Sequence, residues 1–248
     1  MSESLPKRHG QDRNGTIAWL LEREQRSSRA PYPHRSNFVI MAPRRPVRTP
    51  RRKGAAPTHS GRIRLIGGTY RRRLLPVIDS PGLRPTPDRV RETLFNWLGL
   101  HVAGAEVLDL FSGTGALGLE ALSRGARHVH LVEQQPRVAE CLRSNITTLD
   151  ASAQATVHIQ DALHWLQQPA PAVPFDLMFL DPPFRKALAA PCCQLLEEGG
   201  WLSDGAFIYL EVESELAFTP PLHWQLHRET HAGESHGLLF QRNLPDNA

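Results

Sequence analysis

After Gly104, short apolar segments alternate with helix-like segments, and this alternation constrains the fold more than any other feature of the chain. Five strands are predicted, at Glu106–Phe111, His128–Val132, Ala155–Ile159, Phe175–Leu180 and Ala206–Val212. The helices predicted after the first four strands are Ala116–Arg124, Pro136–Leu149, Ala162–Gln167 and Lys186–Glu197. Repeated strand–helix units predict a three-layer α/β fold, in which helices cover both faces of a mostly parallel sheet. The final strands, Trp224–Glu229 and Gly237–Arg242, have no crossover helix between them and must pair antiparallel.

The first predicted strand runs into a glycine-rich segment, Asp109-Leu-Phe-Ser-Gly113-Thr-Gly115-Ala-Leu-Gly118. Glycines let the backbone turn tightly and approach a ligand without obstruction from Cβ atoms. The segment follows the carboxyl end of a strand, which is where open α/β sheets bind their ligands. Its G-x-G-x-x-G spacing suits NAD and S-adenosylmethionine (SAM) alike, so the spacing alone leaves both cofactors open.

Three carboxylates at strand ends are candidate cofactor ligands. Glu133 ends the second strand, 20 residues beyond Gly113, where it can accept both hydrogen bonds of a ribose diol in either cofactor. Asp109 precedes the glycine loop, where it would repel a pyrophosphate but attract the ammonium and sulfonium groups of SAM. Asp161 follows the third strand and either accepts from an adenine amino group or caps the next helix; both interpretations stay open. Of the three, Asp109 favours SAM over NAD.

The fourth strand ends in Asp181-Pro182-Pro183-Phe184, a motif that suits an exocyclic amino group on a nucleobase. The prolines end the strand ladder and stiffen the loop, so an acceptor is held rigidly beside an aromatic ring. Such an amino group is a poor nucleophile because its lone pair is delocalised into the base. Asp181 and the Pro182 carbonyl can accept its N–H groups and direct the lone pair at a methyl carbon, while Phe184 stacks on the base. The alternative is an ordinary proline-rich turn, which the position after a buried strand disfavours.

The N-terminal part of the chain is strongly basic. Residues 1–78 carry 18 Lys or Arg and 4 Asp or Glu, whereas residues 79–248 carry 11 and 21. Residues 1–60 are rich in Arg, Ser, Pro and Gly and lack an apolar period, which predicts a disordered basic extension. Met41 begins a stretch that resembles a second start, and we hypothesise that translation begins there. Residues 61–100 are predicted to form a hairpin and a helix, and residues 101–245 a cofactor-binding catalytic domain.

The predicted hairpin holds a cluster of arginines. Arg62-Ile-Arg64-Leu-Ile alternates as an edge strand does, and Gly67-Gly68 marks a turn. Thr69–Leu75 is predicted to return as the second strand, with Arg71-Arg72-Arg73 within it. This density of charge favours contact with phosphates. The alternative is that the charge blunts an edge strand against aggregation.

A helix is predicted after the hairpin. Thr86 is its expected N-cap, and Pro87 its first residue. Arg84, Arg89 and Arg91 flank the face that would carry the chemistry, although Arg89 could equally pair with Asp88 or Glu92 on its own helix. Its predicted apolar face consists of Val90, Leu94, Trp97 and Leu98.

The motifs together resemble a known group of enzymes. Leu108–Gly115, Glu133 and Asp181–Phe184 are similar to the SAM-binding and catalytic motifs of class I amino-methyltransferases. The longer segments Leu83–Leu98 and Ala116–Gly125 resemble the bacterial family that methylates the N2 amino group of one guanine in 16S ribosomal RNA. The resemblance covers about three quarters of the chain, from the hairpin to the last predicted strand, and leaves out the basic extension.

The resemblance implies a Rossmann-like class I methyltransferase fold with SAM as cofactor and small-subunit ribosomal RNA, or an assembly intermediate, as partner. The SAM-binding residues expected on this basis are Asp109, Phe111, Gly113, Gly115, Glu133, Asp161 and Ala162. The residues expected to hold the guanine are Asp181, Pro182, Pro183 and Phe184. The candidate RNA-binding residues are Arg62, Arg64, Arg71, Arg72, Arg73, Arg84 and Arg89.

Three rival functions are considered. A DNA adenine-N6 methyltransferase would also use the Asp-Pro-Pro-Phe motif, but no segment after the fourth strand is long enough for a separate DNA-recognition domain. An NAD-dependent oxidoreductase would leave that motif and the basic hairpin unexplained. A non-catalytic RNA-binding protein with a degenerate SAM fold would not need the acids and the aromatic residue that stand at the expected strand ends.

Composition excludes several other classes. The longest early apolar run, Ile17–Leu21, is too short for a membrane span or a signal peptide. Cys141, Cys192 and Cys193 lack the spacing of a redox or metal motif, which favours reduced thiols in the cytoplasm. The histidines and the three cysteines do not form the combined Cys/His spacing of a structural zinc site, so no metal site is expected. A fold of this size is expected to act as a monomer.

Overall fold

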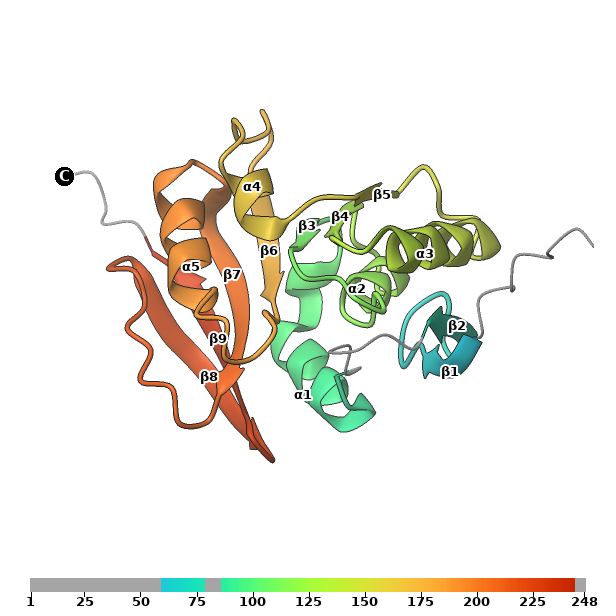
Figure 1. Cartoon of the computed structure of the whole chain (residues 1–248), viewed down its shortest axis with the longest axis horizontal. Helices are drawn as coiled ribbons and strands as arrows, with labels where there is room; N and C mark the ends of the chain where they lie inside the picture. The colour runs from blue at the N-terminus through green and yellow to red at the C-terminus, as the bar shows by residue number, and fades with distance from the viewer. Residues whose placement is uncertain (1–58, 79–85, 244–248) are drawn as a thin grey trace, which may run out of the picture. The chain divides into compact units, whose positions relative to one another are not determined.

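The computed structural model describes residues 59–78 and 86–243, which contain two sheets (Figure 1). The smaller sheet is the antiparallel pair β1 (His59–Arg64) and β2 (Leu74–Ile78). The larger sheet has the strand order β5-β4-β3-β6-β7-β9-β8. Its strands are β3 (Glu106–Asp109), β4 (His128–Val132), β5 (Ala155–His158), β6 (Phe175–Leu180), β7 (Leu202–Glu213), β8 (Trp224–Ala232) and β9 (Ser235–Arg242). Strands β3 to β7 are parallel and β9 is antiparallel to both of its neighbours, which confirms the predicted sheet and its antiparallel C-terminal pair.

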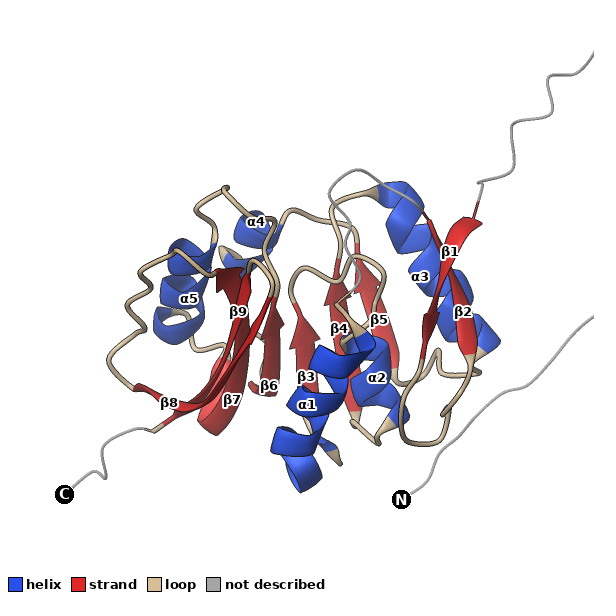
Figure 2. Cartoon of the chain, turned by 90° about the horizontal axis from the view of Figure 1, so that it is seen from below, coloured by secondary structure: helices blue, strands red, loops and turns tan. Residues whose placement is uncertain are grey.

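Helices cover both faces of the large sheet (Figure 2). One face packs on α1 (Asp88–Leu98), α2 (Gly118–Ser123) and α3 (Pro136–Thr148), and the other on α4 (Ala162–Leu166) and α5 (Ala189–Glu198). A short 3-10 helix, Gly99–Val102, continues α1. Each face buries its own hydrophobic cluster, so the sheet is enclosed as the alternating pattern predicts. None of the helices in the described ranges has the length and apolar character needed to cross a membrane.

Two helices begin later than predicted, and backbone conformation explains both differences. Strand β3 ends at Asp109 rather than Phe111, and α2 begins at Gly118 rather than Ala116. The glycines of the loop between them have positive φ angles, which a helix excludes. Helix α5 begins at Ala189 rather than Lys186, because Arg185 and Ala187 also have positive φ angles. Longer loops therefore follow β3 and β6, the two central strands.

The prediction that Arg71-Arg72-Arg73 lies in the return strand of the hairpin is wrong. Strand β2 begins only at Leu74, so the three arginines lie in the loop between β1 and β2. Arg72 has a φ angle of 68°, and its N–H donates to the Leu65 carbonyl at 2.8 Å. The arginines therefore project from a closed loop rather than from alternate faces of a strand.

The prediction that Thr86 caps α1 is also wrong. The helix begins at Asp88, Pro87 occupies the cap position, and no side chain bonds to the free N–H groups there. The Thr86 carbonyl instead accepts from Nε of Arg91 at 3.3 Å. The predicted apolar face is confirmed, since Val90, Leu94 and Leu98 are buried and Trp97 packs against the same cluster.

The β1–β2 loop is fixed to α2 through Glu120, whose side chain is 0% exposed. Its carboxylate accepts from the N–H groups of Ile66 at 2.7 Å and Gly67 at 2.8 Å. Ser123 adds a second attachment, because its Oγ accepts from the Tyr70 N–H and its carbonyl accepts from the Thr69 N–H. The hairpin is therefore held against the helix that follows the glycine loop.

Candidate active site

The carboxyl ends of β3 and β6 lie side by side at the centre of the sheet, with Asp109 opposite Phe179 in the register. The glycine loop leaves the end of β3, and the Asp181–Phe184 motif leaves the end of β6. Two motifs that are about 70 residues apart in sequence thus meet at one edge of the sheet. This is the edge at which open α/β sheets bind ligands.

The glycine loop folds back on itself around Asp109. Gly113 and Gly115 have φ angles of 47° and 79°, and the Gly115 N–H donates to the Ser112 carbonyl at 2.6 Å. A Cβ at Gly115 would lie 2.5 Å from the end of the Leu142 side chain of α3, so a larger residue would displace that side chain and would be strained by the positive φ angle. The Gly118 N–H donates to Oδ2 of Asp109 at 2.9 Å, which ties the start of α2 to the end of β3.

Asp109 is a buried acid with a strongly altered affinity for protons. Burial is the main cause, and the nearby carboxylate of Glu133 adds to it, so the pKa of Asp109 rises to about 7. The hydrogen bond from Gly118 opposes this rise. A cation bound beside Asp109 would restore the ionised form, which is the behaviour expected of a site for an ammonium or sulfonium group.

Glu133 reaches the glycine loop from the end of β4. Its Oε2 accepts from the Gly113 N–H at 3.0 Å and its Oε1 from the Gln135 N–H at 2.7 Å. Burial raises the pKa of Glu133, although these hydrogen bonds work in the opposite direction. Each carboxylate oxygen has a further lone pair, so the side chain can still accept from two hydroxyls of a ribose. The geometry of Glu133 thus fits its predicted role as the acceptor for the ribose hydroxyls.

Asp161 caps α4, as one of its two predicted interpretations requires. Its Oδ1 accepts from the His164 N–H at 3.0 Å. Asp161 is exposed, the following Ala162 is buried, and Phe111 in the glycine loop is half-buried. A contact from Asp161 to an adenine amino group remains a prediction.

The Asp-Pro-Pro-Phe motif places a perturbed acid beside an aromatic ring. Asp181 and Phe184 are half-buried, Pro182 is buried and Pro183 is exposed. The pKa of Asp181 is raised well above its ordinary value, first by burial and then by the carboxylates of Glu211 and Asp109. The carboxylate of Asp181 is accordingly a stronger hydrogen-bond acceptor and base than an exposed aspartate.

The sequence reasoning missed a further acid at this edge, Glu211. It lies in β7, one residue beyond Leu210, which stands opposite Leu180 of β6. The side chain is 7% exposed, and its Oε2 accepts from the Tyr209 hydroxyl at 3.3 Å. The signal was available in the sequence, because Glu211 is the only charged residue within the predicted apolar strand Ala206–Val212.

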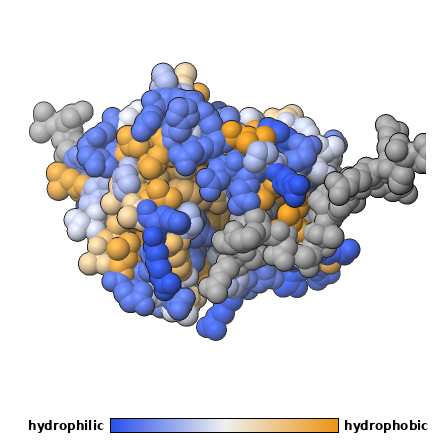
Figure 3. Space-filling model, viewed as in Figure 1, coloured by the Kyte–Doolittle hydropathy of each residue, from blue (hydrophilic) through white to orange (hydrophobic). Residues whose placement is uncertain are grey.

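The candidate RNA-binding arginines lie on the hairpin and the start of α1. Arg62, Arg64, Arg71, Arg72, Arg73 and Arg89 are all exposed. The visible face of the protein is mostly hydrophilic, with scattered hydrophobic patches (Figure 3). Arg64 pairs with Asp88 at 2.8 Å, and Nη2 of Arg73 donates to the Thr148 carbonyl. Within the described ranges Arg89 pairs with neither Asp88 nor Glu92, and Arg84 lies outside those ranges.

Arg91, expected to flank the catalytic face, is buried and is therefore not available to RNA. Its side chain is 2% exposed and donates to Asp88 at 2.6 Å and to the Arg64 carbonyl at 3.0 Å. A further contact runs to the Ala116 carbonyl in the glycine loop, and Glu120 lies at 3.8 Å. Arg91 therefore links the hairpin, α1 and the cofactor loop from inside.

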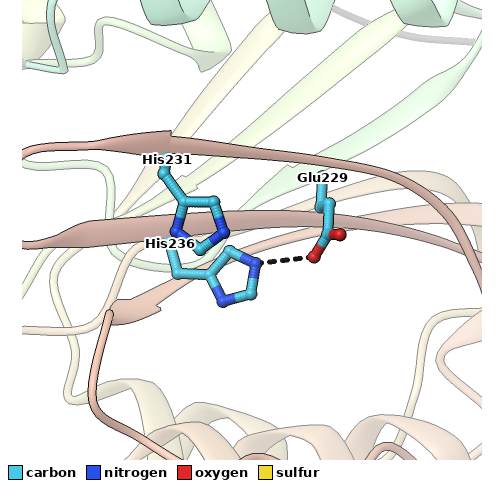
Figure 4. A group of neighbouring side chains, drawn as sticks. All are labelled: Glu229, His231 and His236. Atoms are coloured by element: carbon cyan, nitrogen blue, oxygen red, sulfur yellow. Dashed lines mark hydrogen bonds and ion pairs between the residues drawn. The ribbon is translucent and has the colours of Figure 1, made fainter.

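The β8–β9 hairpin brings together Glu229, His231 and His236 (Figure 4). His231 stands opposite His236 in the register, their rings stack at 4.0 Å, and Nε2 of His236 lies 2.9 Å from Glu229. These are ligand types that bind zinc, and the three ligand atoms lie within 4.8 Å of one another. His231 and His236 are only five residues apart, so the sequence analysis missed a histidine spacing that was present in the chain. The expectation of no metal site remains a prediction.

Comparisons with known proteins agree with this architecture. A family model described as Conserved hypothetical protein 95 matches residues 63–241. A protein named ribosomal RNA small subunit methyltransferase D from Escherichia coli is 50% identical over 75% of this chain and 94% of its own length. The protein of the same name from Haemophilus influenzae is 44% identical over 77% of this chain and 99% of its own length.

Solved structures support the same assignment. The Escherichia coli protein yhhF, provisionally described as a methyltransferase, superposes with a TM-score of 0.68 at 49% identity, covering 75% of this chain and all of that one. The predicted class I methyltransferase fold is confirmed. The chain therefore belongs to the Conserved hypothetical protein 95 family, together with the proteins named ribosomal RNA small subunit methyltransferase D.

Proposed function

We propose that this protein transfers a methyl group from SAM to the N2 amino group of a guanine in small-subunit ribosomal RNA. The observation that carries the proposal is the position of Asp181–Phe184 at the end of β6, directly beside β3 and its cofactor loop. The names of the relatives at 50% and 44% identity support ribosomal RNA as the substrate and methyl transfer as the reaction. A cytoplasmic, monomeric enzyme is part of the same proposal.

SAM is the cofactor, and its sulfonium supplies the electrophilic methyl group. Asp109 attracts the positive charge, the glycine loop allows close approach of the backbone, and Glu133 accepts from the ribose hydroxyls. Hydrogen bonds already connect both acids to the glycine-rich segment, because Glu133 accepts from the Gly113 N–H and Asp109 accepts from the Gly118 N–H. A pyrophosphate in place of SAM would meet two buried acids, which disfavours an NAD-dependent oxidoreductase.

Asp181 acts on the amino group of the base. Its carboxylate accepts one N–H while the Pro182 carbonyl accepts the other, which aims the nitrogen lone pair at the methyl carbon. The raised pKa of Asp181 makes its carboxylate able to hold the proton that the nitrogen loses after transfer. Phe184 stacks on the extruded base and fixes its plane. Positioning and electrostatics supply most of the rate enhancement.

The role of Glu133 predicts the effect of a conservative substitution. Glu133→Gln is expected to weaken SAM binding by about 10-fold or more, because one charged acceptor for the ribose is lost. Isothermal titration calorimetry with SAM measures this affinity. Glu140→Gln on α3 is the matched control, because the Glu140 side chain is 76% exposed. This variant should bind SAM with the affinity of the wild type. Unchanged affinity in Glu133→Gln would remove this residue from the cofactor site.

The role of the hairpin predicts a change in salt dependence. Replacing Arg71, Arg72 and Arg73 together by alanine is expected to weaken RNA binding and to make the slope of log K against log salt shallower by about 2, because each phosphate contact contributes roughly 0.7–0.9. Titrations of ribosomal RNA at several salt concentrations measure the slope. A triple variant of the exposed Arg127, Arg143 and Arg228 removes the same charge elsewhere and serves as control. Equal slopes in the wild type and the hairpin variant would favour the edge-strand interpretation.

Incubation with methyl-labelled SAM tests the class of substrate. Small ribosomal subunits lacking the modification, naked small-subunit RNA and double-stranded DNA are offered separately, and incorporation into each is counted. We expect label in one or both ribosomal substrates and none in DNA. Label in DNA alone would favour the adenine-N6 methyltransferase of the rival interpretation.

A further inference from the structure

Glu211 lies beside the catalytic motif in a way that the proposed reaction does not yet use. Leu180, the last residue of β6, stands opposite Leu210 of β7, so Asp181, the first residue after β6, is the neighbour in sequence of one member of this pair and Glu211 of the other. The carboxylates are close enough for Glu211 to oppose ionisation of Asp181. Glu211 is 7% exposed, and a buried acid requires either a partner or a function.

One of the two oxygens of the Glu211 carboxylate already has a hydrogen-bond partner. Oε2 accepts from the hydroxyl of Tyr209, which is fully buried on the same strand. Gly237 of β9 stands opposite Glu211, and a Cβ there would lie 2.5 Å from the Tyr209 oxygen, so the tyrosine fills this space completely. Oε1 of Glu211 accepts from no donor in residues 59–78 or 86–243. A positioned carboxylate oxygen is thus left for a ligand beside Asp181.

The chemistry of guanine supplies the missing donor. The N2 amino group of guanine is adjacent to N1, which carries a hydrogen, whereas N1 of adenine is an acceptor with no hydrogen. A carboxylate binds the first and repels the second. We propose that Glu211 accepts the N1–H of the target guanine through Oε1, while Asp181 accepts from the neighbouring N2 amino group; this inference rests on the function proposed above. Glu211 is in this account the residue that selects guanine, and Tyr209 positions it.

The arrangement explains why two acids stand at one site. Two adjacent donors on one edge of the base, N1–H and N2–H, require two adjacent acceptors. Glu211 lies within β7 and Asp181 directly follows the last paired residue of β6, so the register of the two strands holds the two acids at the same level of the sheet. An analogue with an unprotonated N1 leaves Glu211 unpaired, and a site of this kind rejects such analogues strongly.

The test uses the RNA segment that contains the modified nucleotide, synthesised with guanine or 2-aminopurine at that position. 2-Aminopurine keeps the amino group but has an unprotonated N1. Wild-type protein is expected to prefer guanine by about 100-fold or more in kcat/KM. Glu211→Gln should reduce this preference at least about 10-fold and raise the rate with 2-aminopurine, since the glutamine amide can donate to N1. The missing O6 of 2-aminopurine affects both proteins equally and cancels in the comparison.

Two further variants complete the experiment. Glu215→Gln, an exposed acid shortly after β7, is the matched control and should keep the wild-type preference. Tyr209→Phe keeps the Glu211 carboxylate but removes the hydroxyl that donates to it. This variant should lower the preference for guanine over 2-aminopurine by roughly 3- to 10-fold. If Glu211→Gln does not fold, the result for Tyr209→Phe tests the inference. If folded Glu211→Gln keeps the wild-type preference for guanine, the inference about Glu211 is overturned. Formation of N2-methylguanine by the wild-type protein would in that case still support the proposed function. Wild-type protein that methylates no guanine overturns both.

Discussion

Asp181→Ala is expected to lower turnover by about 1,000-fold while SAM binds with nearly the affinity of the wild type. In the proposed reaction the carboxylate contacts the amino group of the base and not the cofactor, so its loss removes an interaction of the transition state rather than of cofactor binding. Single-turnover rates with ribosomal RNA and calorimetry with SAM separate the two effects. Asp204→Ala, an exposed acid on β7, is the control and should keep full activity. An equal loss of SAM affinity would place Asp181 in the cofactor site instead.

The same carboxyl predicts how the rate depends on pH. Burial, Glu211 and Asp109 raise the pKa of Asp181, so its accepting form is present only above that raised pKa. The single-turnover rate of the wild type should therefore increase with pH, with an apparent pKa higher than the value near 4 of an ordinary aspartate. Asp181→Ala should lose this step from its residual rate. A rate that is level from pH 4 upward would argue against an ionised Asp181 as acceptor.

Glu120→Ala is expected to cost about 3–5 kcal/mol in the free energy of unfolding, the usual penalty for breaking a buried charge pair. The substitution leaves the N–H groups of Ile66 and Gly67 without their acceptor. It also removes the charge that faces Arg91 and the direct partner of Arg124 at 2.7 Å. Urea unfolding followed by circular dichroism measures the loss.

The exposed Glu140 again provides the comparison, because Glu140→Ala removes the same charge from a helix surface and should change stability by less than about 0.5 kcal/mol. A loss below about 1 kcal/mol for Glu120→Ala would mean that the hairpin is not held by this carboxylate. Native-state hydrogen exchange at Ile66 and Gly67 gives a local readout, and protection there should fall more than in β3.

The sheet and the cofactor loop could be predicted from the sequence because they depend on local patterns. The alternation of strand and helix segments predicts that β3 to β7 are parallel, which places strand-end acids such as Asp109 and Asp181 at one edge of the sheet. The order of the strands within the sheet was not predicted. The glycine spacing identified the loop but not its length. Loop length depends on the positive φ angles that Gly113 and Gly115 adopt, and Gly115 packs closely against Leu142 of α3 and Leu119 of α2.

The residues that escaped prediction owe their roles to contacts between distant segments. Arg91 has the same sequence signature as Arg89, yet it is buried because Asp88, Arg64 and Ala116 surround it in the folded chain. Glu120 looks like an exposed helix residue in sequence, and only the returning hairpin makes it a buried acceptor. Glu211 became a candidate only through the register between β6 and β7.

The identity of the methylated nucleoside tests the central proposal most directly. Small ribosomal subunits that lack the modification are incubated with the protein and methyl-labelled SAM, and their RNA is digested to nucleosides for chromatography and mass spectrometry. We predict that the label co-elutes with N2-methylguanosine and that Asp181→Ala incorporates it about 1,000-fold more slowly. Label in N6-methyladenosine, or in any nucleoside other than N2-methylguanosine, would contradict the account.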